Sequence, residues 1–185
     1  MSDKHRDTIE MLQQSYAMEL ETVINYLANS INLDGVRAQQ IKSSLADDIA
    51  EEIQHAEQLG RRIKQLGGPL PGSATLTIGS QMQPPLGTTQ VVDVIEGVIA
   101  AEEAACEQYQ RTIAATHRRD PVTADLCTRL LAEEEEHLVL FRGFLKEYEN
   151  DGNDEREQKS NETNRPNLPS LDDTDAFIPT MLGLS

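Results

Sequence analysis

Aromatic residues are scarce in this sequence: they make up 4% of its 185 residues, and tryptophan is absent. A β-sandwich or β-barrel usually contains more aromatic and β-branched residues than this. No apolar run approaches the ~18–20 residues that a membrane-spanning helix requires. The opening residues, MSDKHRDTIE, lack the apolar stretch of a signal peptide. We therefore expect a cytoplasmic protein that does not associate with membranes.

Cysteine and positive charge are also in short supply. The only cysteines, Cys106 and Cys127, are too few for a disulfide framework, and the paired C-x-x-C motifs of a rubredoxin-type iron site are missing. The chain has 32 acidic and 16 basic side chains and a net charge of −16. Such a charge repels phosphate backbones and attracts cations, so we expect no nucleic-acid partner.

Four long stretches show the periodicity of amphipathic helices, at about residues 6–30, 36–66, 89–117 and 121–149. Short turns join the first stretch to the second and the third to the fourth, whereas residues 67–88 are rich in Pro and Gly and can cross the length of a bundle. The sequence predicts an all-α fold, an antiparallel four-helix bundle of two helical hairpins with one long crossover. Residues 1–149 would form the bundle, and residues 150–185 an acidic, flexible tail.

A carboxylate interrupts each of the four apolar stripes near the middle of its helix. In the second and fourth helices a histidine follows three residues later, on the same face of the helix. The two hairpins are near-copies, since 33 residues separate Glu19 from Glu52 and 32 separate Glu102 from Glu134. We expect these side chains to meet at one level of the bundle. The predicted set is Glu19, Glu52, His55, Glu102, Glu134 and His137.

Four buried carboxylates predict bound cations, because repulsion and desolvation would otherwise raise their pKa values or unfold the bundle. Two divalent ions would balance the four charges, with one imidazole for each ion. An oxygen-rich site with one histidine per metal suits iron or manganese better than zinc. The same constellation is described for di-iron carboxylate bundles, so we predict two iron ions, with manganese as the alternative.

The candidate ligands must be distinguished from nearby glutamates and tyrosines. Glu102 is favoured over Glu103 because it precedes Tyr109 by seven residues, as Glu19 precedes Tyr26. The two tyrosines could be core residues, hydrogen-bond donors to ligating carboxylates or one-electron sources. Three further carboxylates in the fourth helix are expected to be solvated, namely Glu133, Glu135 and Glu136.

The two cysteines point within about 40° of the predicted seam if each residue turns the helix by ~100°. They are either two small buried side chains or neighbours near the metals, where a disulfide or a redox role would be open to them.

The stretches that carry these motifs resemble a known family. They are ELETVINYL around Glu19, EEIQHAEQLGRRIKQLGG around Glu52, AAEEAACEQY around Glu102 and DPVTADLCTRLLAEEEEH, which ends at His137. Over residues 6–149 the sequence resembles the bacterioferritin branch of the ferritin-like superfamily, including Dps-like mini-ferritins with a bacterioferritin-type centre.

The resemblance implies a role for each predicted ligand. Glu52 and Glu134 would bridge the two metals. Glu19 and His55 would complete one iron site, and the other predicted pair, Glu102 and His137, would complete the second. Haem is not expected, because Ile53 stands next to Glu52 where bacterioferritins have the haem-binding Met.

The activity implied by the resemblance is that of a ferroxidase, in which Fe²⁺ is oxidised by O₂ or H₂O₂ for iron storage or detoxification. The protein would assemble into a homo-oligomeric shell of 12 or 24 subunits. The alternative is a di-iron or di-manganese enzyme that acts on peroxide or on an organic substrate.

The end of the chain suggests a docking peptide. Its polar, acidic stretch is followed by an apolar segment, AFIPTMLGLS. This ending is similar in style to the C-terminal peptides that load ferritin-like cargo into encapsulin shells, which makes such a shell a candidate partner. Alternatively, the segment packs on its own subunit or on a symmetry mate.

Overall fold

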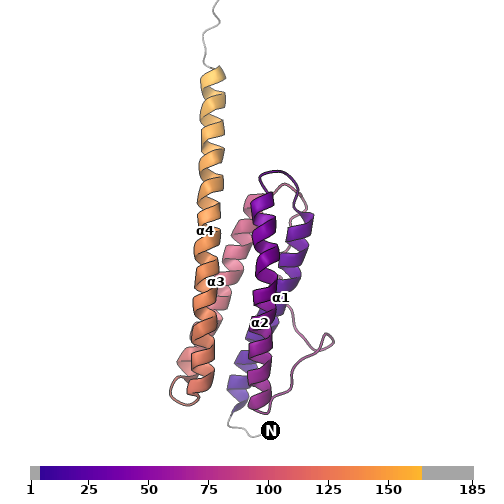
Figure 1. Ribbon diagram of the computed structural model, residues 1–185, viewed down its shortest axis with the longest axis vertical. Coiled ribbons are helices and arrows are strands. Elements are labelled where there is room, and N and C mark those ends of the chain that lie inside the picture. The colour runs from indigo at the N-terminus through magenta and orange to yellow at the C-terminus, as the bar shows by residue number, and fades with distance from the viewer. Residues whose placement is uncertain (1–4, 164–185) are drawn as a thin grey trace, which may run out of the picture. The chain divides into compact units, whose positions relative to one another are not determined.

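The computed structural model describes the chain from residue 5 to residue 163, with side chains up to residue 150. Four α-helices make up this part, and it contains no strand (Figure 1). They are α1 (Arg6–Asn32), α2 (Gln39–Gln65), α3 (Val91–Thr116) and α4 (Pro121–Thr163). None of these helices is both long enough and apolar enough to cross a membrane. The predicted all-α fold is confirmed.

The connections give the bundle its topology. Residues 33–38 join α1 to α2 and residues 117–120 join α3 to α4, so each pair forms a helical hairpin. The crossover, residues 66–90, runs from the end of α2 to the start of α3 (Figure 1). The fold is therefore the antiparallel four-helix bundle with one long crossover that the sequence predicts, and its packed part, up to Glu149 of α4, forms one compact unit.

Two glycines end α2 and begin the crossover. Gly67 adopts a left-handed φ of +83°, and its N–H donates to the Lys64 carbonyl at 3.1 Å, while the N–H of Gly68 donates to the Ile63 carbonyl at 2.9 Å. These two bonds form a Schellman motif, which satisfies the last carbonyls of the helix. A Cβ atom on Gly68 would lie 2.7 Å from Ile9 Cγ2, so a larger residue would push α1 away from this turn.

A buried ion pair fixes the start of α4 against the end of α2. Asp120 caps α4 by accepting a 3.2 Å hydrogen bond from the Thr123 N–H. The same carboxylate accepts a 2.5 Å hydrogen bond from Arg62, near the end of α2. Burial alone would raise the pKa of Asp120, but the hydrogen bonds from Arg62 and Thr123 outweigh burial and lower this pKa.

Replacing Asp120 by alanine should lower the free energy of unfolding by about 2 kcal/mol, because it removes the cap and leaves Arg62 without its carboxylate. Since the pKa of Asp120 is lower in the folded chain, its contribution is present above the unfolded pKa of about 3.9 and is lost as the pH falls through the folded value. Urea unfolding followed by circular dichroism at neutral and acidic pH measures both effects. The control is Asp125→Ala, which removes only an exposed ion pair with Arg129. Equal midpoints for Asp120→Ala and the wild type at neutral pH would contradict this role.

The core consists of two apolar clusters that occupy different stretches of the helices. One cluster contains Leu12, Leu59, Tyr109 and Leu130. The other contains Tyr26, Leu45, Val98 and Phe141. In each helix the predicted ligand carboxylate lies between the residues of the two clusters. The fold therefore holds a polar layer between two apolar layers.

Buried polar side chains on α1 bind the crossover. The Glu21 carboxylate accepts hydrogen bonds from the N–H groups of Gly79 at 3.0 Å and of Gln81 at 2.7 Å. One turn further on, Asn25 donates to the Gln81 carbonyl at 2.9 Å, and Asn29 donates to the Met82 carbonyl at 3.2 Å. These contacts bind residues 79–82, which we call the strap, to α1.

The end of the fourth helix differs from the prediction. Periodicity predicts an end near Glu149, where the apolar stripe stops, but α4 continues to Thr163. Residues 150–163 contain no proline, and their one glycine, Gly152, lowers helix propensity without ending the helix. The apolar segment behind the encapsulin hypothesis, residues 176–185, lies outside the described residues, and that hypothesis stays a prediction.

Candidate metal centre

All six predicted ligands are buried at one level of the bundle, where every helix contributes at least one of them. Helices α1 and α3 contribute one carboxylate each, and α2 and α4 contribute a carboxylate and a histidine each. The buried set comprises Glu19, Glu52, His55, Glu102, Glu134 and His137.

These side chains form two overlapping groups with metal-ligand geometry. In each group, ligand atoms from the four members all lie within 4.8 Å of one another. Glu52 and Glu134 belong to both groups. The first group is completed by Glu19 and His55, and the second by Glu102 and His137. Two cation positions that share two carboxylates fit this arrangement.

Both imidazoles turn Nδ1 toward the carboxylates. His55 Nδ1 lies 3.0 Å from Glu134 Oε1 and 3.5 Å from Glu19 Oε2. His137 Nδ1 lies 3.4 Å from Glu52 Oε1 and also 3.4 Å from Glu134 Oε2. One nitrogen of each ring is therefore available to a metal, and the same nitrogen is used in both rings.

The centre contains buried polar atoms without hydrogen-bond partners. They are Glu52 Oε1, Glu134 Oε2 and His137 Nδ1, and the histidine nitrogen lies 3.4 Å from each of the two oxygens. A buried carboxylate oxygen without a donor is costly, and folded proteins rarely leave one. A divalent cation among these atoms removes the cost, so the residues present fit bound metal ions.

Without a bound cation, two carboxyl groups and both imidazoles of the centre bind protons more tightly than usual. Burial, followed by repulsion from neighbouring carboxylates, raises the pKa values of Glu52 and Glu102 well above their ordinary value. Burial alone would lower the histidine pKa values, but the adjoining carboxylates raise the pKa of His55 to about 11 and that of His137 to about 9. Protons and metal ions therefore compete for the same ligands.

Two tyrosines orient the two carboxylates of the centre that belong to only one ligand group, Glu19 and Glu102. Tyr26 on α1 donates a hydrogen bond to Glu102 on α3, and Tyr109 on α3 donates one to Glu19 on α1. Burial raises the pKa of both phenols well above the ordinary value, so each is a neutral donor. Of the roles considered from the sequence, the geometry supports that of a hydrogen-bond donor to a candidate ligand carboxylate.

The predicted ligands point into the bundle, whereas the glutamates next to them in the sequence are exposed or half exposed. Glu102 faces the centre, whereas the side chain of Glu103 is half exposed and accepts a 2.7 Å hydrogen bond from Arg142. On α4, Glu135 and Glu136 are exposed, as the sequence predicts.

Comparison with known proteins places the chain in a family. Residues 9–150, most of the chain, match the family described as Ferritin, a ferritin-like domain. The chain belongs to the ferritin-like family.

Two curated relatives are similar to this chain in sequence, and one solved structure is similar to it in fold. A bacterioferritin of Desulfovibrio desulfuricans is 29% identical over 153 residues, which cover 82% of this chain and 81% of the relative. A DNA protection during starvation protein of Pyrococcus furiosus is 30% identical over 141 residues, covering 74% of this chain and 76% of that protein. The dodecameric thioferritin of Bacteroides fragilis superposes with a TM-score of 0.71 at 20% identity, covering 80% of this chain and 90% of that one.

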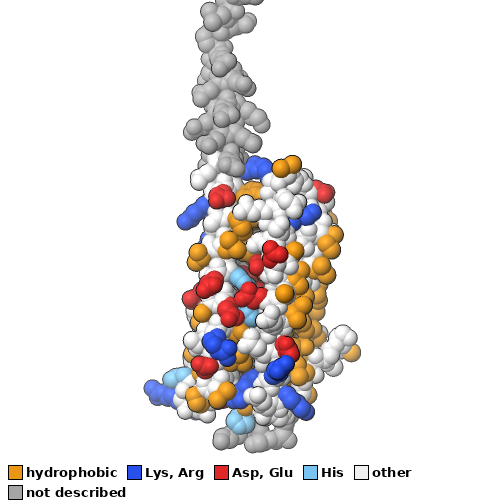
Figure 2. All heavy atoms as spheres, viewed as in Figure 1, with side chains coloured by type: hydrophobic (Ala, Val, Ile, Leu, Met, Phe, Trp, Pro, Cys, Tyr) orange, Lys and Arg blue, Asp and Glu red, His pale blue; other side chains and the backbone are white. Residues whose placement is uncertain are grey.

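Two further carboxylates, which the sequence did not predict, border the candidate centre. Glu133, predicted to be solvated, lies with Oε2 at 2.8 Å from His55 Nε2, and Glu51 lies with Oε2 at 3.6 Å from His137 Nε2. Figure 2 shows acidic side chains gathered around imidazole on the face formed by α2 and α4. In the sequence, Glu51 directly precedes Glu52, and Glu133 directly precedes Glu134. A second glutamate directly before each shared carboxylate is the feature of the sequence that could have indicated Glu51 and Glu133.

Replacing Glu133 by glutamine should weaken Co²⁺ binding about tenfold, because a carboxylate that accepts from the far nitrogen of a ligating imidazole fixes its tautomer and raises its basicity. Anaerobic titration of the visible Co²⁺ bands measures the affinity. Glu136→Gln is the matched control, since it removes the same charge from an exposed position on the same helix. An equal loss in both variants would mean that only the net charge matters.

Neither cysteine takes part in the candidate centre. Cys106 and Cys127 are free, buried thiols, and neither belongs to a metal-ligand group among the described residues. Burial raises the pKa of each thiol to about 12, so both stay protonated and unreactive. The structure thus favours two small buried side chains over a disulfide.

Proposed function

We propose that this ferritin-like chain is a ferroxidase with a dinuclear centre inside each subunit, and that it oxidises Fe²⁺ for storage or detoxification. Glu52 and Glu134 bridge the two iron positions, His55 and Glu19 complete one, and His137 and Glu102 complete the other. The observation that carries the proposal is the pair of overlapping ligand groups that share two carboxylates.

The charge of the ligand set suits iron that enters reduced and leaves oxidised. Four carboxylates balance two Fe²⁺ ions. Two Fe²⁺ ions give one electron each to O₂, which takes up two protons and becomes H₂O₂. With H₂O₂ as oxidant, the same two electrons and two protons give two molecules of water. Two Fe³⁺ ions exceed the ligand charge by two, and a buried surplus of charge favours their release as mineral precursor.

The space above the carboxylates favours a small oxidant over an organic substrate. The cavity that reaches them has a volume of about 10 Å³, which is the room that one water molecule needs. Pockets for organic ligands usually enclose about 300–1,000 Å³. The geometry therefore supports oxidation of bound Fe²⁺ by O₂ or H₂O₂.

Anaerobic titration with Fe²⁺, followed by O₂ and monitored by absorbance, tests the proposal. We expect binding to saturate at two Fe²⁺ per chain and the bound iron to be oxidised faster than the same concentration of free iron. Saturation at one ion per chain, or oxidation no faster than in buffer, would contradict it. The same titration with Mn²⁺ and H₂O₂ distinguishes the di-manganese alternative, which predicts catalytic loss of peroxide.

An exposed apolar stripe on α1 supports assembly into a shell. Ile24, Leu27 and Ile31 recur at helical spacing, and they are 52%, 51% and 67% exposed. Large apolar side chains gathered on one face usually mark a contact surface. We propose a homo-oligomeric shell of this chain, with 12 or 24 subunits, in which the stripe lies between subunits.

A further inference from the structure

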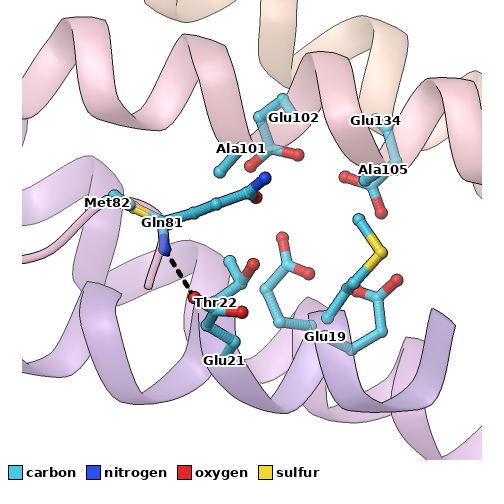
Figure 3. Close-up of a pocket in the computed structure, with 11 residues that line it drawn as sticks. Glu19, Glu21, Thr22, Gln81, Met82, Ala101, Glu102, Ala105 and Glu134 are labelled. Carbon is cyan, nitrogen blue, oxygen red and sulfur yellow. Dashed lines mark hydrogen bonds between the residues drawn. The ribbon is translucent and has the colours of Figure 1, made fainter. Parts of the chain in front are cut away.

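A small closed cavity lies over the carboxylates on the side of the bundle where α1 faces α3. Figure 3 shows Glu19, Glu102 and Glu134 around it. Two residues of the strap, Gln81 and Met82, line it from the crossover. The cavity therefore connects the candidate iron positions with a segment of the crossover that is far from them in sequence.

The backbone of the strap is fixed. Glu21, Asn25 and Asn29 bind it along one face of α1, as described above. Met82 adopts a left-handed φ of +49° although it is not a glycine. On the α3 side, a Cβ atom on Gly97 would lie 3.4 Å from Met82 Cα, an ordinary van der Waals distance, so the strap also packs against α3. A fixed backbone leaves the side chains of the strap as the parts that can move.

Gln81 lies at the boundary between the cavity and an open groove. The groove, with a volume of about 1040 Å³, runs along α1 under the crossover and shares Met18, Glu21 and Gln81 with the closed cavity. In Figure 3 the Gln81 side chain extends across the cavity toward Glu102. Gln81 is an exposed residue that lines both spaces, so its side chain lies between them.

The boundary suits a neutral molecule better than a cation. The Glu21 carboxylate is already engaged by two backbone N–H groups of the strap. The other two shared residues, Met18 and Gln81, carry a thioether and a carboxamide. In contrast, half-exposed Glu51 and Glu133 surround the histidines on the face formed by α2 and α4, where a cation would be attracted.

We propose that Gln81 gates this cavity, so that a small neutral oxidant, O₂ or H₂O₂, reaches bound iron past its side chain while bulkier peroxides are held back. The inference rests on the proposed ferroxidase function. Gln81 then determines which oxidants reach the bound iron, although it is not a metal ligand.

The test compares oxidants of two sizes in single turnover. The chain is loaded anaerobically with two Fe²⁺ per subunit and mixed with H₂O₂ or with tert-butyl hydroperoxide, and the absorbance of Fe³⁺ is followed. For each sample we compare the rate with H₂O₂ to the rate with tert-butyl hydroperoxide. In the wild type this ratio should be at least about tenfold higher than the same ratio for free Fe²⁺. Gln81→Ala should reduce this preference at least about fivefold, mainly by accelerating the bulky peroxide.

Two further variants make the test specific. Gln83→Ala is the matched control: Gln83 donates to the Gln81 carbonyl at 3.2 Å but lines neither the cavity nor the groove. It should keep the wild-type preference. Met18→Ala opens the same boundary from α1 and should reduce the preference as Gln81→Ala does, which provides the test if Gln81→Ala does not fold.

The outcomes separate the gate from the ferroxidase proposal. A wild type that binds two Fe²⁺ per chain and oxidises them, but shows no size preference, overturns the gate alone. So does a preference that persists in both Gln81→Ala and Met18→Ala. A wild type that fails to bind two Fe²⁺ overturns the ferroxidase proposal and the gate together.

Discussion

Replacing Glu134 by alanine should lower the rate of Fe²⁺ oxidation by at least about 100-fold, the upper end of what the loss of an outer-shell partner costs. Glu134 belongs to both ligand groups, so both iron positions lose a ligand at once. Glu52→Ala should have a similar effect for the same reason. The helices should survive, because removal of one buried carboxylate also removes repulsion from its neighbours.

The control for this prediction is Glu135→Ala, one residue further along α4. Glu135 is exposed and belongs to neither ligand group. Stopped-flow oxidation at two Fe²⁺ per chain measures the rates, and circular dichroism shows whether each variant keeps its helices. If Glu134→Ala oxidised iron at the wild-type rate, Glu134 would not be a bridging ligand.

Placing charges on the exposed stripe of α1 should dissociate the shell. In the double variant Leu27→Asp, Ile31→Asp, two side chains that are half or more exposed in the isolated chain acquire charges that an interface would have to desolvate. Each apolar side chain also loses the ~1.5–3 kcal/mol that its full burial contributes. We expect the native mass to fall from that of a shell to that of one or two chains of 20.6 kDa.

Native mass spectrometry measures this change, and Leu27→Met is the matched control because it keeps the position apolar. The ferritin-like bundle itself should remain helical, since the stripe faces away from its core. A charged variant that keeps the full native mass would show that the stripe is not a subunit contact. A wild type that is monomeric would contradict the proposed shell.

The grouping of the six candidate ligands could be predicted from the sequence because the pattern in each helix is local. Each ligand carboxylate interrupts an apolar stripe, and the Glu-x-x-His spacing places His55 beside Glu52 on one helix face. The repeat of the hairpin then brings the ligands of the second half to the same level. The fold followed from the same periodicity together with two short turns and one long crossover.

Other features depend on distant partners, so no local pattern reveals them. Glu21 and Asn25 look like surface residues of α1, yet they are buried because the backbone of the strap lies against them. The contact of Glu133 with His55 depends on how α2 packs beside α4. The end of α4 was predicted too early because the apolar stripe stops where the core ends, whereas the backbone needs no apolar partner to continue the helix.

Anomalous scattering at the iron edge, from crystals grown anaerobically with Fe²⁺, tests the central claim most directly. We expect two peaks in each chain, both bordered by Glu52 and Glu134, one next to His55 and the other next to His137. A single peak bordered by Glu51, His55 and Glu133, the remaining group of candidate ligands, or no peak at all between the four helices, would contradict it.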